Sequence, residues 1–181
     1  EIDCAILAEP FPDTGLAIAP LYDEPFLAAV PSTHPLAQQE SISTQQLKNE
    51  TMLLLGAGHC FRDHVLEVCP EFARYASNAE GIRRSFEGSS LETIKHMVAA
   101  GMGVTLVPRL SVANDALQSP RRRRSDEPYI RYLPIVEPDG SAPPKRRVSL
   151  VWRRSFTRYE AIAALRNAIH ACKLLGVERL N

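Results

Sequence analysis

Short hydrophobic runs alternate with stretches of helical periodicity along this chain of 181 residues. Buried strands are predicted over residues 2–8, 52–55, 82–86, 104–107, 129–136 and 148–152. Residues 16–30 are predicted to form extended segments, which Asp23, Glu24 and Pro25 interrupt and Pro31 ends. Helices are predicted over residues 43–50, 61–69, 90–100 and 159–175. This alternation predicts a mixed α/β fold whose chain passes between two lobes.

The stretch 90–100 has the clearest helical pattern. Its apolar stripe consists of Leu91, Ile94, Met97 and Val98. Gly101 and Gly103 are predicted to stop this helix before the strand that Pro108 ends. The Gly101-x-Gly103 pair is too short for a dinucleotide-binding fingerprint, and no cofactor is expected.

Charge and composition narrow the class of protein. Lys plus Arg equals Asp plus Glu at 21 each, so the formal net charge is zero. Because neutralised phosphates supply most of the affinity for nucleic acids, a chain of zero net charge is not expected to hold DNA by itself. Hydrophobic runs are shorter than the roughly 20 residues of a membrane span, so no membrane contact is expected.

The cysteines and the N-terminal sequence indicate the cellular compartment of the protein. The chain opens in strand-like sequence without a signal-peptide pattern, which suggests a fragment of a longer protein. Four cysteines are too few and too scattered for a secreted disulfide scaffold. A cytoplasmic location is therefore expected, where a disulfide is more often redox-active than structural.

Cys60 lies where the strand 52–55 gives way to the helix 61–69. Unpaired N–H groups and the positive end of the helix dipole favour a thiolate at the start of a helix. His59 and Arg62 add donors and positive charge nearby, which makes Cys60 a candidate nucleophile. Peroxide oxidises such a thiolate to a sulfenic acid, and a second thiol can capture it as a disulfide.

Cys69 is the candidate second thiol, nine residues further on. Nine helical steps separate the two α-carbons by roughly 13 Å. A disulfide needs them about 4.4–6.8 Å apart, so the bond requires the helix to unwind. Pro70 is predicted to leave Cys69 at a frayed helix end. The residue pattern also allows both cysteines to be plain buried hydrophobes, and on spacing alone both interpretations stay open.

Other chemically suggestive residues favour ordinary roles. Asp126 and Glu127 follow Arg121–Arg124 directly, which favours a solvated loop over a phosphate contact. Cys4 and Cys172 fall on apolar faces and are predicted to pack in the core. No metal site is expected, because ligand-like spacing is missing among His34, His64 and His96. A cysteine hydrolase built on His59 and Cys60 would need an oxyanion-hole motif, which the sequence does not offer.

Several segments resemble the effector domain of LysR-type transcriptional regulators. They are Pro20–Pro31 followed by His34-Pro35-Leu36-Ala37, Ser89–Thr93 leading to Met97–Pro108, and Val148–Arg153. The segment Gly58–Asp63 (GHCFRD), together with Cys69, is similar to the peroxide-sensing members of that family. The resemblance covers nearly the whole chain.

The resemblance implies a two-lobed α/β domain like the periplasmic binding proteins. Residues 1–23 would be part of lobe I, residues 24–152 would form lobe II with the redox cysteines, and residues 153–181 would return to lobe I. The beginning of the first lobe is expected to lie outside the chain, together with the hydroxyl groups that it supplies to the peroxide pocket.

The resemblance also implies roles for individual residues. Cys60 would be the peroxidatic cysteine and Cys69 the resolving one, with helix 61–69 rebuilt when the disulfide forms. His59 and Arg62 would help activate hydrogen peroxide and stabilise the thiolate. The remaining pocket residues would be Gly58, Ser89, Ser90, Thr93 and Arg146, or Arg147 if the register is shifted by one.

By the same resemblance the chain would be a sensor and not an enzyme. It would dimerise through the effector domain, form a homotetramer in the full protein and contact RNA polymerase. DNA would be bound by an N-terminal winged helix-turn-helix absent from this chain. Two alternative functions stay open. The domain could bind a small organic effector between its lobes through Ser89, Ser90 and Thr93, or it could be a thiol peroxidase that reduces many peroxide molecules per chain.

Overall fold

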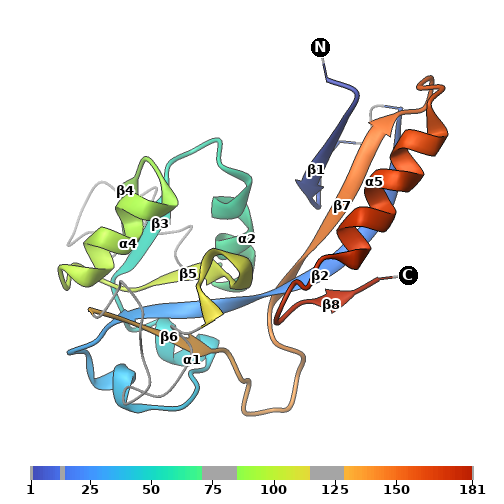
Figure 1. Cartoon of the computed structure of the whole chain (residues 1–181). Helices are drawn as coiled ribbons and strands as arrows, with labels where there is room; N and C mark the ends of the chain where they lie inside the picture. Colours follow the sequence, from blue (N-terminus) through green and yellow to red (C-terminus); the bar gives the residue numbers. More distant parts are fainter. Residues whose placement is uncertain (1, 13–14, 71–84, 115–128, 181) are drawn as a thin grey trace. The chain divides into compact units, whose positions relative to one another are not determined.

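The computed structural model describes residues 2–12, 15–70, 85–114 and 129–180. The chain folds into two compact units (Figure 1). Unit 1 consists of Glu1–Pro25 and Lys145–Asn181, and unit 2 consists of Phe26–Pro144. The chain leaves unit 1 inside one long strand, β2 (Leu16–Pro31), and returns at the start of another, β7 (Lys145–Arg153).

Unit 1 is a small antiparallel sheet with one helix. β7 pairs with β1 (Cys4–Ala8) on one side and with the first part of β2 on the other. A two-residue strand, β8 (Glu178–Arg179), pairs with β2 as well and was not predicted. Helix α5 (Tyr159–Ala171) lies alongside these strands in Figure 1, and its Ile162 packs with Leu21 and Leu150 in a small core.

Unit 2 contains the larger core and a mixed set of strands. The second part of β2 pairs antiparallel with β5 (Thr105–Pro108) and with β6 (Ile130–Pro134). β3 (Met52–Leu55) pairs in parallel with β4 (Ser85–Gly88). The backbone of β3 also joins Val104 just before β5, since Leu53 N donates to Val104 O at 2.8 Å.

The helices of unit 2 are short. They are α1 (Thr44–Leu47), α2 (Cys60–Val68) and α4 (Leu91–Ala99), with 3-10 turns η1 (Pro35–Gln38) and η2 (Arg109–Ser111). Ser43 caps α1 in a capping box with Gln46. The predicted stripe of α4 is confirmed, because Ile94 and Val98 are buried and Leu91 and Met97 pack against the core.

The parallel pairing of β3 and β4 decides where the next helices begin. Leu55 is in register with Gly88, and Gly56 N donates to Gly88 O at 3.0 Å. The carboxyl ends of both strands therefore lie at one edge of the sheet. Because α2 follows β3 and α4 follows β4 after short turns, both helices begin at that edge.

The predicted interruption of residues 16–30 is wrong, since β2 is continuous from Leu16 to Pro31. Asp23 and Glu24 stay inside the strand because β7 supplies their counter-charges: Asp23 is in register with Arg147 and Glu24 with Arg146. The irregularity lies earlier, where the register with β7 shifts between Pro20 and Tyr22. Polar residues that would usually mark a turn are thus tolerated by cross-strand pairing.

Other boundaries differ by smaller amounts. The strand predicted at 82–86 is β4 at Ser85–Gly88, with residues 82–84 outside the described residues. Helix α5 ends at Ala171, so Cys172 is its C-cap and is exposed, and the prediction that Cys172 packs in the core is wrong. Cys4 is half-buried and does pack against the core of unit 1.

The predicted lobe boundaries were Asp23 and Trp152. The compact units divide close to the first, after Pro25, but at Lys145 on the return. The return comes earlier because all of β7, from Lys145 onward, pairs with strands of unit 1. The run Arg121–Arg124 lies outside the described residues.

Candidate redox site

Cys60 is the first residue of α2 and its side chain is exposed. The turn before it contains Gly58 in the left-handed region (φ +94°), a backbone geometry that favours glycine. His59 is the N-cap of α2, and within the described residues its side chain makes no capping hydrogen bond. Cys60 is thus an exposed thiol at the start of a helix, which is the position that the sequence predicted for it.

Arg62 is engaged by two acceptors at the edge of the sheet. Its Nη1 donates to the backbone oxygen of Leu55 at 2.8 Å and to Glu87 Oε1 at 2.7 Å. The Arg62 side chain is only 12% exposed, whereas that of Glu87 is 53% exposed. The guanidinium thus fastens the first turn of α2 to the ends of β3 and β4. Sequence reasoning did not identify Glu87, which lies on β4.

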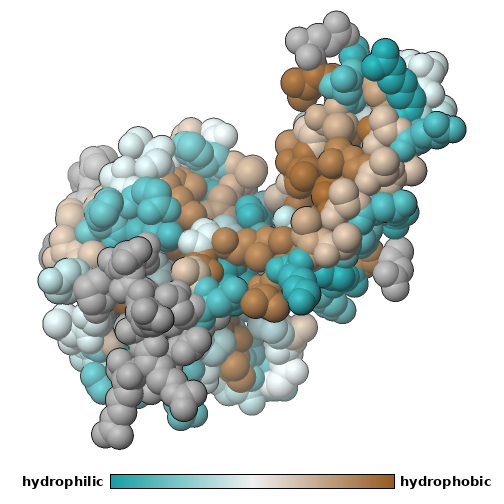
Figure 2. Space-filling view, in the orientation of Figure 1, coloured by the Kyte–Doolittle hydropathy of each residue, from teal (hydrophilic) through white to brown (hydrophobic). Residues whose placement is uncertain are grey.

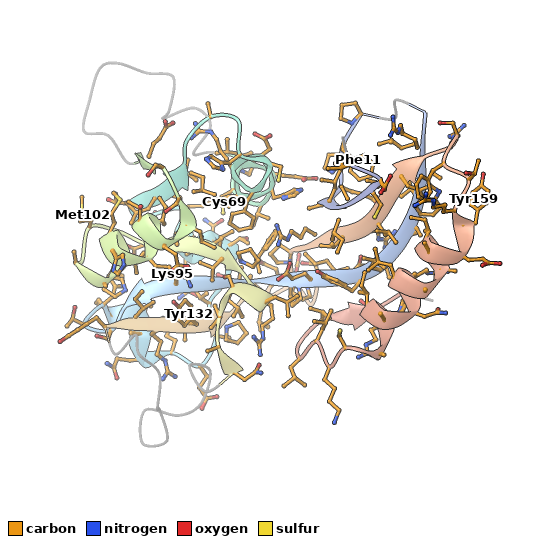
Figure 3. The ribbon with its side chains drawn as sticks, turned by 45° about the horizontal axis from the view of Figure 1, so that its top comes forward. Phe11, Cys69, Lys95, Met102, Tyr132 and Tyr159 are labelled. Atoms are coloured by element: carbon orange, nitrogen blue, oxygen red, sulfur yellow. The ribbon has the colours of Figure 1, made fainter. Side chains whose placement is uncertain are left out.

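Cys69 lies at the other end of α2 and is fully buried. It is the C-cap, and its backbone N–H donates to Val65 O at 2.9 Å. Figure 3 labels Cys69 among the side chains of unit 2, where it belongs to the main hydrophobic core. The predicted fraying of this helix end stays a prediction, and the burial of Cys69 in the core opposes it. None of the four cysteines is joined to another by a disulfide in this structure.

An aromatic cluster fixes the buried face of α2. The rings of Phe26 and Phe61 meet edge to face with centroids 5.4 Å apart. The buried His64 ring lies 6.3 Å from Phe26 and 6.4 Å from Phe61. Such ring pairs add to the stability given by burial alone. The middle of α2 is therefore anchored in the core, and His64 serves packing.

The predicted hydroxyl residues lie at the start of α4. Ser90 is the N-cap, and its Oγ accepts a hydrogen bond from Thr93 N at 3.1 Å. The hydroxyls of Ser90 and Thr93 are 3.0 Å apart. Ser89 is exposed and directly follows Gly88, the last residue of β4. The structure therefore brings this turn to the same sheet edge as the turn that carries Gly58, His59 and Cys60.

Arg146 belongs to unit 1, whereas Cys60 belongs to unit 2. Its guanidinium pairs with the buried Glu24, with Nη2 2.7 Å and Nε 2.8 Å from Glu24 Oε2. Arg147 pairs with Asp23 at 2.8 Å through Nε. An approach of either arginine to Cys60 stays a prediction.

The cross-strand ion pairs of unit 1 shift pKa values. The hydrogen bond from Arg147 lowers the pKa of Asp23 to about 2, and Lys145 adds to this effect while burial opposes it. Lys145 Nζ lies 2.8 Å from Asp23 Oδ2 and 2.8 Å from Glu178 Oε2. Hydrogen bonds to these carboxylates raise the pKa of Lys145. The acidic pair at 23–24 and the basic run at 145–147 were the signal that could have predicted this pairing.

Unit 1 also carries an apolar surface. A hollow of about 360 Å³ is lined by residues 2–5, 7, 16 and 151–153, none of which was predicted as a site residue. Leu7 is among its lining residues, and β1 and β2 carry further exposed hydrophobic side chains, Ile6 and Ile18. Figure 2 shows such a hydrophobic patch on the visible face of this unit.

In the described parts of the chain, no group of three or more His, Cys, Asp or Glu side chains is placed to hold a metal ion. Among the helices of those same parts, none is long and apolar enough to cross a membrane.

Comparison with known proteins identifies the family. The family model described as "LysR substrate binding domain" matches residues 1–172. The chain belongs to this family, and the predicted α/β effector-domain fold is confirmed. Its relatives include the "Hydrogen peroxide-inducible genes activator" of Pectobacterium carotovorum subsp. carotovorum and the "DNA-binding transcriptional dual regulator OxyR" of Escherichia coli (strain K12). The predicted similarity to peroxide-sensing members is thereby confirmed.

The similarity to these relatives covers most of this chain but only about half of each relative. Each of the two relatives is 37% identical over 166 residues, covering 90% of this chain but 49% and 48% of the relative. The chain thus spans about half the length of the curated relatives it matches. A solved structure, "a reduced form of OxyR from N. meningitidis", is 35% identical with a TM-score of 0.83 and covers 99% of this chain and 76% of that chain.

Proposed function

We propose that this chain is the hydrogen-peroxide-sensing regulatory domain of a cytoplasmic LysR-type transcription regulator. The observation that carries the proposal is the placement of two thiols on one helix. Cys60 is exposed at the first turn of α2, and Cys69 is buried at its end. The relatives named for peroxide induction support the same sensing function.

The first step is attack of the Cys60 thiolate on hydrogen peroxide. A sulfur–oxygen bond forms as the oxygen–oxygen bond breaks, and the departing hydroxide takes a proton to become water. Sulfur is oxidised to sulfenic acid and peroxide is reduced. An exposed thiol at the start of a helix that has no side-chain cap suits this step. His59 is adjacent and is proposed to assist the proton transfer.

The second step joins the two cysteines. The sulfur of Cys69 attacks the Cys60 sulfenic acid, the sulfur–sulfur bond forms, and the hydroxyl leaves as water with the thiol proton. A continuous α2 keeps the two α-carbons roughly 13 Å apart, so the helix has to unwind before the bond forms. Unwinding also withdraws Cys69 from the core, and oxidation thereby changes the packing of unit 2.

The output of the sensor is proposed to be a change in assembly. A rebuilt α2 would alter how regulatory domains pack in a dimer and in a homotetramer. A DNA-binding region elsewhere in the full protein, a winged helix-turn-helix, would carry that change to promoter DNA and RNA polymerase. The relative named as a DNA-binding regulator supports this division of labour.

Titration with hydrogen peroxide and peptide mass mapping test the proposal. The wild-type chain should form one Cys60–Cys69 disulfide per molecule and consume about one peroxide. Cys60→Ser should form no disulfide, Cys69→Ser should stop at the Cys60 sulfenic acid, and Cys172→Ser should behave as wild type. Cys60 left unmodified at low peroxide would refute the sensor. Many peroxide molecules consumed per chain in the presence of reductant would instead indicate a thiol peroxidase.

A further inference from the structure

The first turn of α2 is fastened to the sheet by the polar contacts of Arg62, beside the buried ring of Phe61. Its N-cap residue, His59, supplies no side-chain cap within the described residues, whereas α4 is capped by Ser90. Arg62 Nη1 instead donates to the oxygen of Leu55, the last residue of β3, and to a carboxylate oxygen of Glu87 on β4. The guanidinium is largely buried against the ends of both strands.

We infer that Glu87 is a positioning residue of the redox switch: by holding Arg62, it keeps the start of α2 in the conformation of the reduced protein. This inference rests on the proposed function and extends it to a residue that neither acts as a thiol nor touches one. Glu87 completes a clamp made of Leu55, Arg62 and Glu87, which we call the α2 clamp.

The α2 clamp opposes disulfide formation for a geometric reason. Arg62 lies two residues after Cys60, inside the helix that has to unwind. Cys60 cannot approach Cys69 while the first turn stays fastened to Leu55 and Glu87. The clamp therefore stabilises the reduced form relative to the disulfide form, and its contacts are broken or rebuilt when the disulfide forms.

The size of the effect follows from exposure. The Glu87 side chain is 53% exposed, so solvent and salt screen its attraction to Arg62. Ion pairs of this kind change an equilibrium by about two- to fivefold. The bond from Arg62 to the Leu55 oxygen remains when Glu87 is replaced, so loss of the carboxylate weakens the clamp without abolishing it.

The test compares Glu87→Gln with Glu40→Gln, the same charge change at an exposed position of unit 2. Each purified chain is equilibrated in glutathione buffers, and the Cys60–Cys69 disulfide is quantified by alkylation and mass spectrometry. Glu87→Gln should shift the equilibrium about two- to fivefold toward the disulfide, which lowers the reduction potential by about 10–20 mV. Glu40→Gln should match wild type.

Two further readouts separate positioning from a general loss of stability. Raising the salt concentration should move wild type toward Glu87→Gln, because screening weakens the pair in wild type alone. Glu87→Asp should fall between the two, because a shorter carboxylate is retained. The rate at which Cys69 converts the Cys60 sulfenic acid into the disulfide should rise about two- to fivefold in Glu87→Gln. The rate of sulfenic acid formation is determined separately in chains that carry Cys69→Ser.

The outcomes distinguish this inference from the proposed function. If wild type forms no Cys60–Cys69 disulfide, the proposed function fails and the clamp has no switch to act on. If wild type forms the disulfide but Glu87→Gln has the wild-type potential, or stabilises the reduced form, the inference about Glu87 is overturned while the sensor stands.

Discussion

Cys69 has two roles that conflict with each other. As a core residue it is fully buried and lies in the main cluster of unit 2. As a proposed resolving thiol it must leave this core to reach Cys60. Interiors are packed closely, so its departure leaves a void unless neighbouring side chains move in. Rearrangement of the core is therefore part of the proposed chemistry and not a later consequence of it.

Gly103 illustrates a constraint that is invisible in a local pattern. The sequence predicted that Gly101 and Gly103 both stop the preceding helix, but only Gly101 has a left-handed backbone (φ +77°). At Gly103 a Cβ atom would lie 2.4 Å from the backbone oxygen of Thr51. That oxygen accepts a hydrogen bond from Val104, which joins the segment before β5 to β3.

Gly103→Ala is expected to lower the free energy of unfolding by about 1–3 kcal/mol, because backbone atoms would have to move apart. Gly103→Ala and an Ala99→Gly control in the helix should be compared by urea denaturation of the reduced protein. The control should lose about 1 kcal/mol through helix propensity, together with the small contribution of the Ala99 methyl group to core packing. A Gly103→Ala chain as stable as wild type would show that β3 and the segment before β5 do not approach this closely.

At the scale of elements, α2 and α4 form a natural comparison. Both contain nine residues and both begin at the shared end of β3 and β4. Ser90 caps α4 through Thr93 N, whereas the start of α2 has the α2 clamp and the buried ring of Phe61 in place of a side-chain cap. An N-cap side chain contributes about 1 kcal/mol to the stability of a helix. We therefore expect the first turn of α2, which has no side-chain cap, to open more readily than that of α4.

Hydrogen exchange followed by mass spectrometry should show this difference. In the reduced protein, amides in the first turns of α2 are expected to exchange before those at matching positions of α4. Ser90→Ala should accelerate exchange in α4 and reduce the difference. Equal or slower exchange in α2 would contradict the assignment of α2 as the less stable helix.

Local sequence patterns located most of these elements but not all of their partners. Apolar periodicity and capping residues were sufficient for β3, α2, α4 and β5, because each is defined within its own segment. The continuity of β2 through Asp23 and Glu24 depends on Arg146 and Arg147, more than a hundred residues away. The same holds for the site: a turn after a strand predicted the position of Cys60, whereas Glu87 reaches Arg62 only because β4 pairs with β3.

At the scale of the whole molecule, oppositely charged residues lie on the two strands, β2 and β7, at which the chain passes from one unit to the other. Asp23 and Glu24 on β2 face Arg147 and Arg146 on β7, immediately before and after the unit boundaries. Glu24 is fully buried and Asp23 nearly so. A buried ion pair is costly to break by removing one partner, so these pairs fix the register of the two strands.

The free energy of unfolding at acid pH should depend on the ion pairs that fix the register of β2 and β7. The pKa of Asp23 is lowered from 3.8 to about 2. A lowered pKa contributes stability that is fully present above the unfolded value and is lost as pH falls through the folded value. The free energy of unfolding should therefore fall by about 1–2 kcal/mol between roughly pH 4 and pH 2, the exposed partners Lys145 and Arg147 limiting the effect.

Asp23→Asn provides the matched control for this pH dependence. The variant should be less stable than wild type at neutral pH, and the difference should shrink toward pH 2 as Asp23 itself takes up a proton. Thermal unfolding at a series of pH values is the measurement. A difference that stays constant down to pH 2 would show that the Asp23 carboxylate does not contribute through its charge.

The unequal exposure of the four cysteines gives the protein an internal standard. Cys172 is exposed in unit 1 and Cys60 is exposed in unit 2, while Cys69 is buried. An alkylating reagent reaches the two exposed thiols without unfolding the chain, so the ratio of their labelling rates compares intrinsic nucleophilicity within one molecule. Variation in protein concentration, reagent age or damage cancels in that ratio. Activation of Cys60 can thus be followed in a mixture or a cell extract, with Cys172 as the reference.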